Sequence, residues 1–212
     1  GLGDVYKRQV LQRADGSVDV VVADVAGKGF AASLIMASVK AMLPFVTADG
    51  GVAESLSRLN HRLAQELGRG EFVALALARY SPVGSTVELA NAGTPDPYVV
   101  RPGEFPLAVP VPGPRLPLGV RAEVAYSSCR MELPGDGRLL MMTDGLPEAR
   151  DPEGEPLGYE ALESMLGEGS GEGSPPEWLR GLFDRVQKRS GRVPEDDWTA
   201  ALLAPIDREL ER

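Results

Sequence analysis

Asp24-Val25-Ala26-Gly27-Lys28-Gly29 follows an apolar run at residues 18–23, which predicts a buried strand, and precedes a helical pattern at residues 30–43. One carboxylate therefore stands at the carboxyl end of a strand, and a glycine-rich turn follows it at once. Hard divalent cations bind carboxylate oxygens together with backbone carbonyls, and glycine lets the backbone come close because it has no side chain. The stretch therefore predicts a metal ligand at Asp24.

Two more acidic motifs border apolar, strand-like runs. Thr143-Asp144-Gly145 ends the run at residues 139–143, and Asp196-Asp197-Trp198-Thr199 leads into the run at residues 199–204. If the fold brings the three motifs together, their carboxylates repel one another unless divalent cations lie between them. Oxygen ligands favour magnesium or manganese, and two such ions can activate water and hold a phosphoryl group.

Each acidic motif also has a plainer interpretation. Asp-Gly is common turn chemistry, and we expect Asp15-Gly16 and Asp136-Gly137 to be turns and nothing more. Asp196 is equally suited to cap a helix or a strand. The metal-site hypothesis therefore depends on the three motifs taken together.

Composition excludes several classes of protein. The 212 residues contain 22 Lys and Arg against 31 Asp and Glu, a net charge of −9, which argues against non-specific binding to nucleic acid. No apolar run is long enough to cross a bilayer, so we expect no membrane insertion. Cys129 is the only cysteine and His61 the only histidine, which excludes an internal disulfide, a thiolate cluster and a multi-histidine zinc site. The expected setting is the reducing cytoplasm.

The expected elements suit an α+β fold. The patterns predict strands at residues 10–13, 18–23, 72–80, 86–90, 123–127, 138–142 and 199–204, and residues 98–100 lead out of a tight loop at residues 91–95. They predict helices at residues 30–43, 52–67, 158–166 and 175–189. Because the strands come in hairpin-like runs and the helices in pairs, we expect a layered α+β sandwich rather than alternating parallel units.

Residues 1–9, GLGDVYKRQ, have neither helical nor strand periodicity. The segment DVYKRQ is what a sequencing-library adapter would encode if it were translated, so we interpret residues 1–9 as a non-native scar. The alternative is a natural, frayed N-terminus. The expected organisation is one domain at residues 10–206 and a C-terminal tail at residues 207–212.

The motifs occur in an order that resembles the SpoIIE-like phosphatases, the bacterial branch of the PPM metal-dependent serine/threonine phosphatases. Asp24 to Gly29 resembles the DVSGKG stretch of that family, and Leu139 to Arg150 resembles its LLLYTDGLTEAR segment. Further segments that match in order are residues 30–37 (PAALLMA), residues 91–97 (NAGHPPP), residues 116–119 (LPLG) and residues 196–199 (DDIT). The resemblance covers nearly the whole chain from about residue 10.

The resemblance implies a PPM-type α-β-β-α sandwich, with two antiparallel sheets packed face to face, flanking helices and a two-metal site at one edge. It implies that metal-bound water hydrolyses phosphoserine or phosphothreonine without a covalent enzyme intermediate. Two divalent cations, manganese or magnesium, would be held by Asp24, the Val25 backbone carbonyl, Asp144 and Asp196. Supporting roles would fall to Gly27, Gly29, Gly145 and Asp197.

The sequence departs from the family in two places. The family has an upstream GGDxYD motif that supplies further acid to the metal site. Here only Gly3-Asp4-Val5-Tyr6 imitates it, and Lys7 stands where the second aspartate would be. Asp4 is thus a candidate metal ligand. If residues 1–9 are a scar, its match to the family motif is a coincidence. The second departure is Thr94 in place of the usual histidine, and we assign it no catalytic role.

The resemblance also implies a partner, a phosphorylated anti-sigma-factor antagonist protein, and an upstream sensor domain that is missing from this fragment. Two other functions stay open. The Lys7 and Thr94 departures favour a catalytically impaired domain that acts as a protein-interaction module. A metal-dependent hydrolase of small phosphate esters would carry the same motifs.

Overall fold

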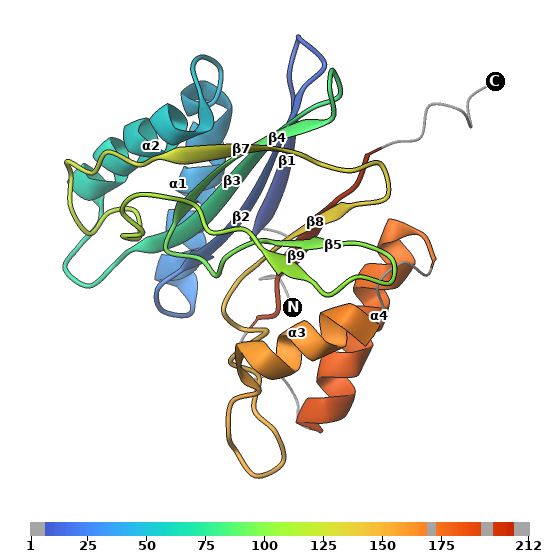
Figure 1. Ribbon diagram of the computed structural model, residues 1–212. Coiled ribbons are helices and arrows are strands. Elements are labelled where there is room, and N and C mark those ends of the chain that lie inside the picture. The colour runs from blue at the N-terminus through green and yellow to red at the C-terminus, as the bar shows by residue number, and fades with distance from the viewer. Residues whose placement is uncertain (1–6, 169–172, 192–196, 206–212) are drawn as a thin grey trace. The chain divides into compact units, whose positions relative to one another are not determined.

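The computed structural model describes residues 7–168, 173–191 and 197–205. The chain divides into two compact units (Figure 1). The first unit comprises Gly1–Asp96 and Pro110–Glu132, and the second comprises Pro97–Val109 and Leu133–Arg212. Each unit contains one antiparallel sheet and two helices, so the expected α+β class is confirmed. The single domain expected at residues 10–206 stays a prediction.

The sheet of the first unit has five antiparallel strands in the order β1-β2-β3-β4-β7. These are β1 (Arg8–Gln12), β2 (Val18–Val25), β3 (Val73–Ser81), β4 (Thr86–Ala92) and β7 (Ser128–Glu132). In the β1–β2 hairpin the Ser17 backbone N–H donates to Asp15 Oδ1 at 2.9 Å, and Gly16 has a φ of 81°. The plain turn expected at Asp15-Gly16 is therefore confirmed.

Two helices, α1 (Phe30–Val46) and α2 (Val52–Glu66), cover one face of this sheet (Figure 1). Side chains alternate between the faces of a strand, and Val21 and Ala23 join Leu43 of α1 in the hydrophobic core. Val20 and Val22, on the other face, are also buried. Burial on both faces explains why residues 20–23 of β2 are all apolar. The same alternation places Asp24 on the face of Val20 and Val22.

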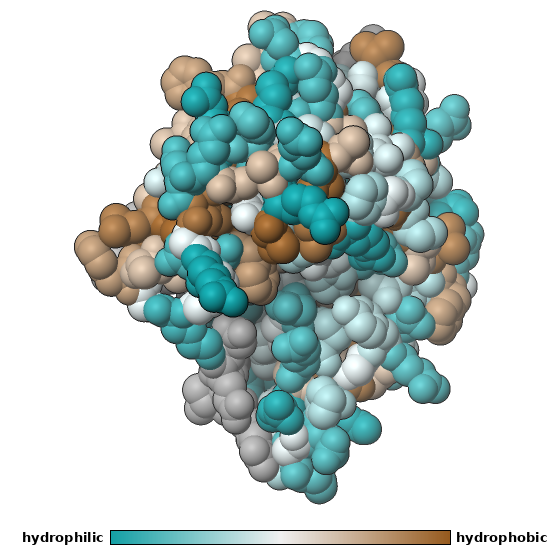
Figure 2. Space-filling view, turned by 90° about the vertical axis from the view of Figure 1, so that its left-hand side faces the viewer, coloured by the Kyte–Doolittle hydropathy of each residue, from teal (hydrophilic) through white to brown (hydrophobic). Residues whose placement is uncertain are grey.

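The helix α1 is apolar on nearly all sides, with Lys40 as its one charged residue. Part of this apolar surface is exposed, because the side chains of Phe30, Leu34 and Phe45 are 80%, 54% and 82% accessible. Figure 2, which faces the side of α1 and α2, shows apolar patches among the polar side chains there. No described helix combines the length and apolarity that a bilayer crossing requires.

The sheet of the second unit has four antiparallel strands in the order β6-β5-β8-β9. These are β5 (Tyr98–Val100), β6 (Leu107–Ala108), β8 (Arg138–Met142) and β9 (Ala200–Leu203). The helices α3 (Gly158–Glu168) and α4 (Pro175–Ser190) bury Leu162, Leu182 and Val186 against it in a core of its own. A Ser174–Glu177 capping box begins α4, and Gly191, with a φ of 62°, ends it.

One predicted strand is wrong. Residues 123–127 are irregular, and β7 begins only at Ser128. Side chains of α2 hold the chain here instead, since Asn60 Nδ2 donates to the carbonyls of Arg121 and Ala122, which directly precede this segment, at 2.8 and 3.0 Å. The Tyr126 N–H contacts Ser57 Oγ at 3.4 Å. Side-chain partners therefore replace the ladder that the apolar pattern predicted.

Most predicted elements differ from the structure by a few residues at one or both ends, and two of these differences have a clear physical cause. The first helix does not end before Pro44 but continues to Val46, and Thr47 caps it by donating its N–H to the Leu43 carbonyl at 3.0 Å. Proline removes one donor from a helix, and here the loss falls in the last turn. Arg8 and Gln9, which lacked strand periodicity, pair with Val22 and Val21 in β1. Backbone pairing at the sheet edge therefore overrides their polar character.

Candidate metal centre

Asp24 is the next-to-last residue of β2, and strand pairing fixes its backbone. Asp24 lies opposite Ala74 and Val25 opposite Val73, and the Ala26 N–H donates to the Phe72 carbonyl at 2.9 Å. The turn that follows contains Gly27 and Gly29 with φ values of 96° and 88°. L-residues with a side chain rarely adopt this left-handed conformation, which explains both glycines. The paired strand thus holds the Asp24 carboxylate directly before a tight turn.

The environment of Asp24 suits a cation. Its side chain is 21% exposed, and the Lys7 ammonium lies 2.5 Å from Oδ1. Oδ1 is buried and forms no hydrogen bond among the described residues, so the Lys7 contact is an ion pair by distance without hydrogen-bond geometry. A carboxylate oxygen that is removed from water without donors is unfavourable unless a cation lies beside it.

The loop of residues 91–95 is organised by Asn91. Its Oδ1 accepts hydrogen bonds from the Thr94 N–H at 2.9 Å and from Thr94 Oγ1 at 3.1 Å. Its Nδ2 donates to the Thr94 and Pro95 carbonyls at 3.0 and 3.2 Å. Thr94 is only 4% exposed, and Arg115 donates to its carbonyl at 2.8 Å. Thr94 is therefore a buried hydroxyl within this loop.

The segment at residues 116–119 is tied to the same region of the first unit. Leu118 exchanges both backbone hydrogen bonds with Val73, at 2.8 and 3.0 Å, and Val73 is the strand partner of Val25. A Cβ atom on Gly93 would lie 2.7 Å from Pro117 Cγ, so only glycine fits there. These two motifs therefore frame the end of β2, and their role is structural.

The other two acidic motifs lie together in the second unit. The Thr143 N–H, after β8, donates to the Thr199 carbonyl at 2.9 Å, and the Thr199 N–H donates to Thr143 Oγ1 at 3.3 Å. A Cβ atom on Gly145 would lie 2.7 Å from the Asp197 carbonyl oxygen. The structure thus brings the Asp144 turn next to the segment that begins at Asp197, and it explains Gly145 by this close approach. Asp144 itself is exposed.

The remaining predicted ligands are placed as follows. Asp4 and Asp196 lie outside the described residues. Asp24 belongs to the first unit and Asp144 to the second, so their grouping stays a prediction. Within the ranges that the structure describes, no three Asp, Glu, His or Cys side chains form a metal-binding group.

Two other reactive residues take no part in these motifs. His61 is exposed on α2 and contacts Gln65 at 3.0 Å, so it lies on the surface of the helix. Burial raises the pKa of the Cys129 thiol, and the Asp96 and Glu88 charges add to this effect. A raised pKa keeps the thiol protonated, and this disfavours a nucleophilic role.

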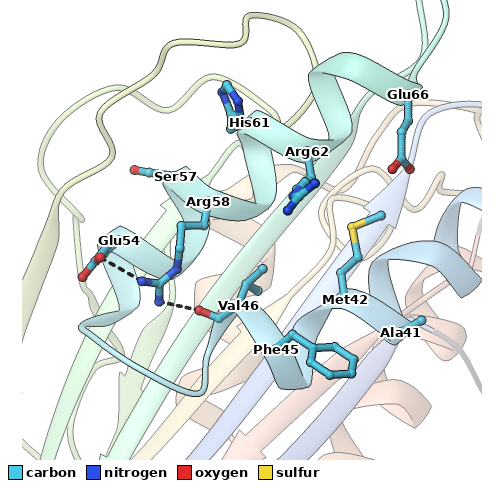
Figure 3. Close-up of a pocket in the computed structure, with 10 residues that line it drawn as sticks. All are labelled: Ala41, Met42, Phe45, Val46, Glu54, Ser57, Arg58, His61, Arg62 and Glu66. Atoms are coloured by element: carbon cyan, nitrogen blue, oxygen red, sulfur yellow. Dashed lines mark hydrogen bonds and ion pairs between the residues drawn. The ribbon is translucent and has the colours of Figure 1, made fainter.

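A groove of ≈ 790 Å³ lies between α1 and α2 (Figure 3). Apolar side chains of α1, among them Met42 and Phe45, form one side, and polar side chains of α2 form the other. Arg58 spans the two helices because it contacts Glu54 at 2.8 Å and donates to the Val46 carbonyl at 2.6 Å. None of the predicted metal ligands lines this groove.

Comparison with known proteins gives the family. Residues 14–204 match Stage II sporulation protein E (SpoIIE). The chain belongs to the SpoIIE family. Phosphoserine phosphatase RsbU of Bacillus subtilis strain 168 is 24% identical over 189 residues, which are 88% of this chain and 55% of that protein. The chain thus spans about half the length of this curated relative.

Solved structures of PP2C domains share the fold. The SiaA-PP2C domain of Pseudomonas aeruginosa has a TM-score of 0.79 at 19% identity, covering 94% of this chain and 80% of that one. The PP2C domain of SpoIIE from Bacillus subtilis has a TM-score of 0.76 at 16% identity, covering 92% and 56%. The structure of the RsbU and RsbW domains of Rv1364c from Mycobacterium tuberculosis has a TM-score of 0.74 at 22% identity, and the match covers 94% of this chain and 55% of that one. The SpoIIE-family chain therefore has the PPM, or PP2C-type, α+β fold.

Phosphatases with this fold generally depend on metal ions, and the residues around Asp24 fit such an ion. The carboxylate has a buried oxygen without a hydrogen bond. Nothing lies within 4 Å of a Cβ atom built on Gly27 or Gly29, so the turn beside Asp24 is open. An oxygen donor beside an open, glycine-rich turn suits a hard divalent cation.

Proposed function

We propose that this SpoIIE-family chain is a metal-dependent phosphoprotein phosphatase domain that hydrolyses phosphoserine and phosphothreonine. Membership of the family and the likeness to phosphoserine phosphatase RsbU support this reaction. The single observation that carries the proposal is Asp24, whose buried Oδ1 has a cation beside it and no hydrogen bond to any residue that the structure describes. That environment is the one in which a carboxylate serves as a cation ligand.

In this proposal two divalent cations, manganese or magnesium, are held by Asp24, the Val25 backbone carbonyl, Asp144 and Asp196. When bound, the cations supply Lewis-acid chemistry, since they activate water and offset the negative charge of a phosphoryl group. The residues with supporting roles are Gly27, Gly29, Gly145 and Asp197. Asp4 is a further candidate ligand.

The chain's own contribution is to hold the ligands still. Asp24 is fixed by its place in β2 between two neighbouring strands. Asp144 follows β8, and its carbonyl accepts the Glu148 N–H at 2.9 Å. Ligands fixed by strand and turn hydrogen bonds need little rearrangement when substrate binds. Lys28, exposed in the turn after Asp24, is suited to attract the substrate phosphate.

The proposed substrate is a phosphorylated anti-sigma-factor antagonist protein, and the proposed setting is the cytoplasm. The likeness to RsbU supports the choice of substrate, and the single cysteine suits a reducing compartment. A sensor domain upstream of the phosphatase domain would supply the signal.

A specific observation favours a second function. The Lys7 ammonium already lies on Asp24, so a domain that holds no divalent cation would still have this carboxylate neutralised. A catalytically impaired domain of this kind would act as a protein-interaction module. Binding of a protein partner without hydrolysis of its phosphoserine would distinguish this function from the first.

The decisive experiment measures phosphate release from a phosphoserine peptide by the chain as written, with and without Mn²⁺. Asp24→Asn and Asp144→Asn test the proposed ligands. Asp184→Asn, at an exposed aspartate on α4, is the matched control for removing one carboxylate. A parallel assay with a small phosphomonoester tests the small-ester hydrolase.

The proposal expects turnover of the phosphopeptide that requires Mn²⁺, disappears in both ligand variants and persists in the Asp184 variant. Faster turnover of the small phosphomonoester would indicate the small-ester hydrolase instead. Turnover that survives Asp24→Asn would overturn the assigned site. Absence of turnover in the chain and in its Lys7→Asp variant, together with tight partner binding, would favour the interaction module.

A further inference from the structure

Lys7 is held beside Asp24 by the backbone of the first unit. The strand β1 begins at Arg8, which lies opposite Val22 of β2. One residue earlier, the Lys7 carbonyl accepts the Ala23 N–H at 2.8 Å. Lys7 therefore continues the pairing of β1 with β2 by one residue and is brought next to Asp24 in the same unit.

The Lys7 side chain is directed onto the predicted metal ligand. Its ammonium lies 2.5 Å from Asp24 Oδ1, and the two side chains are only 15% and 21% exposed. Little water is therefore left to screen the pair. Because Oδ1 has no hydrogen bond among the described residues, the ammonium is the cation that offsets its charge in this structure.

We propose that Lys7, as it stands in this chain, competes with divalent ions for Asp24, so that the chain takes up manganese or magnesium more weakly than it would with an uncharged residue at this position. The inference rests on the proposed metal site. It assigns Lys7 the role of a positioning residue that sets the occupancy of that site.

Simple electrostatics explains the competition. A divalent cation binds carboxylate oxygens at about 2.0–2.6 Å, a range that includes the present Lys7 contact distance. The ion and the ammonium carry like charges and cannot both lie against Oδ1. Lysine is a point charge on a flexible stem, so the ion can displace it, but the free energy of the lost ion pair is subtracted from that of metal binding.

The test measures Mn²⁺ binding by isothermal titration calorimetry, with free Mn²⁺ followed by electron paramagnetic resonance. The variants are Lys7→Met, which removes the charge, Lys7→Asp, which reverses it, and Lys7→Arg, which keeps it. Lys188→Met, at an exposed lysine on α4, is the control for a change in net charge alone. Asp24→Asn is the control for the site itself.

We expect Lys7→Met to lower the Kd for Mn²⁺ by about tenfold or more, the effect of removing one charge within contact distance. Lys7→Asp should lower it further. Lys7→Arg and Lys188→Met should have Kd values for Mn²⁺ close to that of the unmodified chain. When Asp24→Asn is combined with Lys7→Met, the tightened binding should be lost. Circular dichroism checks that each variant folds, and Lys7→Gln replaces any Lys7 variant that does not.

Values of Kd for Lys7→Met and Lys7→Asp within twofold of the unmodified chain would overturn the inference. Because the measurement is of binding, its outcome is independent of hydrolysis. Tightened binding without phosphatase activity in any variant would support the competition and contradict the proposed function. Phosphatase activity together with an unchanged Mn²⁺ affinity in the Lys7 variants would support the proposed function and contradict the competition.

Discussion

Asp19 and Arg79 lie opposite each other on β2 and β3 and form a two-point ion pair, with Arg79 Nε 2.6 Å from Oδ1 and Nη2 3.0 Å from Oδ2. Asp19 is fully buried. The same guanidinium donates to the Gly50 and Thr47 carbonyls at 2.6 and 3.2 Å. This pair therefore joins the central strands of the first sheet to the end of α1.

Asp19→Asn and Arg79→Met should each destabilise the fold by about 3–5 kcal/mol, because each breaks a largely buried ion pair and leaves Asp19 or Arg79 without its main partner, with only the longer 3.4 Å contact of Arg13 left to Asp19 in the second variant. Urea unfolding followed by circular dichroism measures the change. Arg101→Met, which breaks an ion pair with Asp136 at the surface, is the control and should have little effect. Equal losses in all three variants would contradict the importance of the buried pair.

Asn91→Ala should destabilise the chain by about 1–3 kcal/mol, because it leaves the buried Thr94 N–H without its acceptor and removes one donor from each of the Thr94 and Pro95 carbonyls. Thr94→Val removes one hydroxyl from the same loop and should cost less. Thermal unfolding of the two variants gives the comparison. Since Thr94 has no assigned role in catalysis, its replacement should leave the phosphatase rate unchanged, and a large loss of rate would show that this assignment is wrong.

Gly145→Ala should disturb the contact between the Asp144 turn and the segment at residues 197–199. The new Cβ atom would meet the Asp197 carbonyl oxygen at 2.7 Å, and a backbone atom cannot rotate out of the way. The expected loss is about 1–3 kcal/mol, typical of overpacking, together with weaker Mn²⁺ binding. Gly135→Ala, at a glycine with nothing within 4 Å of its Cβ position, is the matched control and should be neutral.

Tyr126 should make the protein sensitive to alkali. Burial raises the pKa of Tyr126 to about 12, and its hydroxyl donates to the Leu116 carbonyl at 2.7 Å. In the unfolded chain the pKa is about 10, so the unfolded state loses this proton first. The stabilisation is therefore complete below about pH 10 and is lost as the pH rises to about 12.

The free energy of unfolding should fall between these values with a contribution of about 1.4 kcal/mol per pH unit from this one proton. Tyr126→Phe should remove that contribution. Urea unfolding of both proteins from pH 9 to 11.5 gives the two slopes, which should differ by one proton. Identical slopes would show that Tyr126 ionises equally easily in the folded and unfolded states.

Periodic patterns predicted most elements of this fold. The apolar run at residues 18–23 and the leucine spacing of residues 56, 59 and 63 correspond to β2 and α2, because burial acts directly on such patterns. The strand expected at residues 123–127 was wrong because side chains of α2, more than 60 positions away in sequence, take up its backbone hydrogen bonds. Local patterns carry no information about partners at that distance.

The local placement of the motif residues was predicted to a similar extent, whereas their role as metal ligands stays a prediction. Asp24, Asp144, Gly27, Gly29 and Gly145 stand where a strand meets a turn, as their motifs indicated, and each glycine has a steric or conformational reason. The buried pair of Asp19 and Arg79 was missed. A charged residue within an apolar run reads as a surface position, and its partner is 60 positions away.

The two ends of α1 are held very differently. Arg13, Arg58 and Arg79 donate to the carbonyls that end the helix, whereas the N-cap residue Gly29 offers no side-chain hydrogen bond and the first turn has no acidic residue. Amide hydrogens of the first turn should therefore exchange with solvent much faster than those near Leu43. Fraying of α1 therefore begins at the end that adjoins the turn of Gly27 and Gly29, so this turn can adjust to a ligand while β2, which holds Asp24, stays intact.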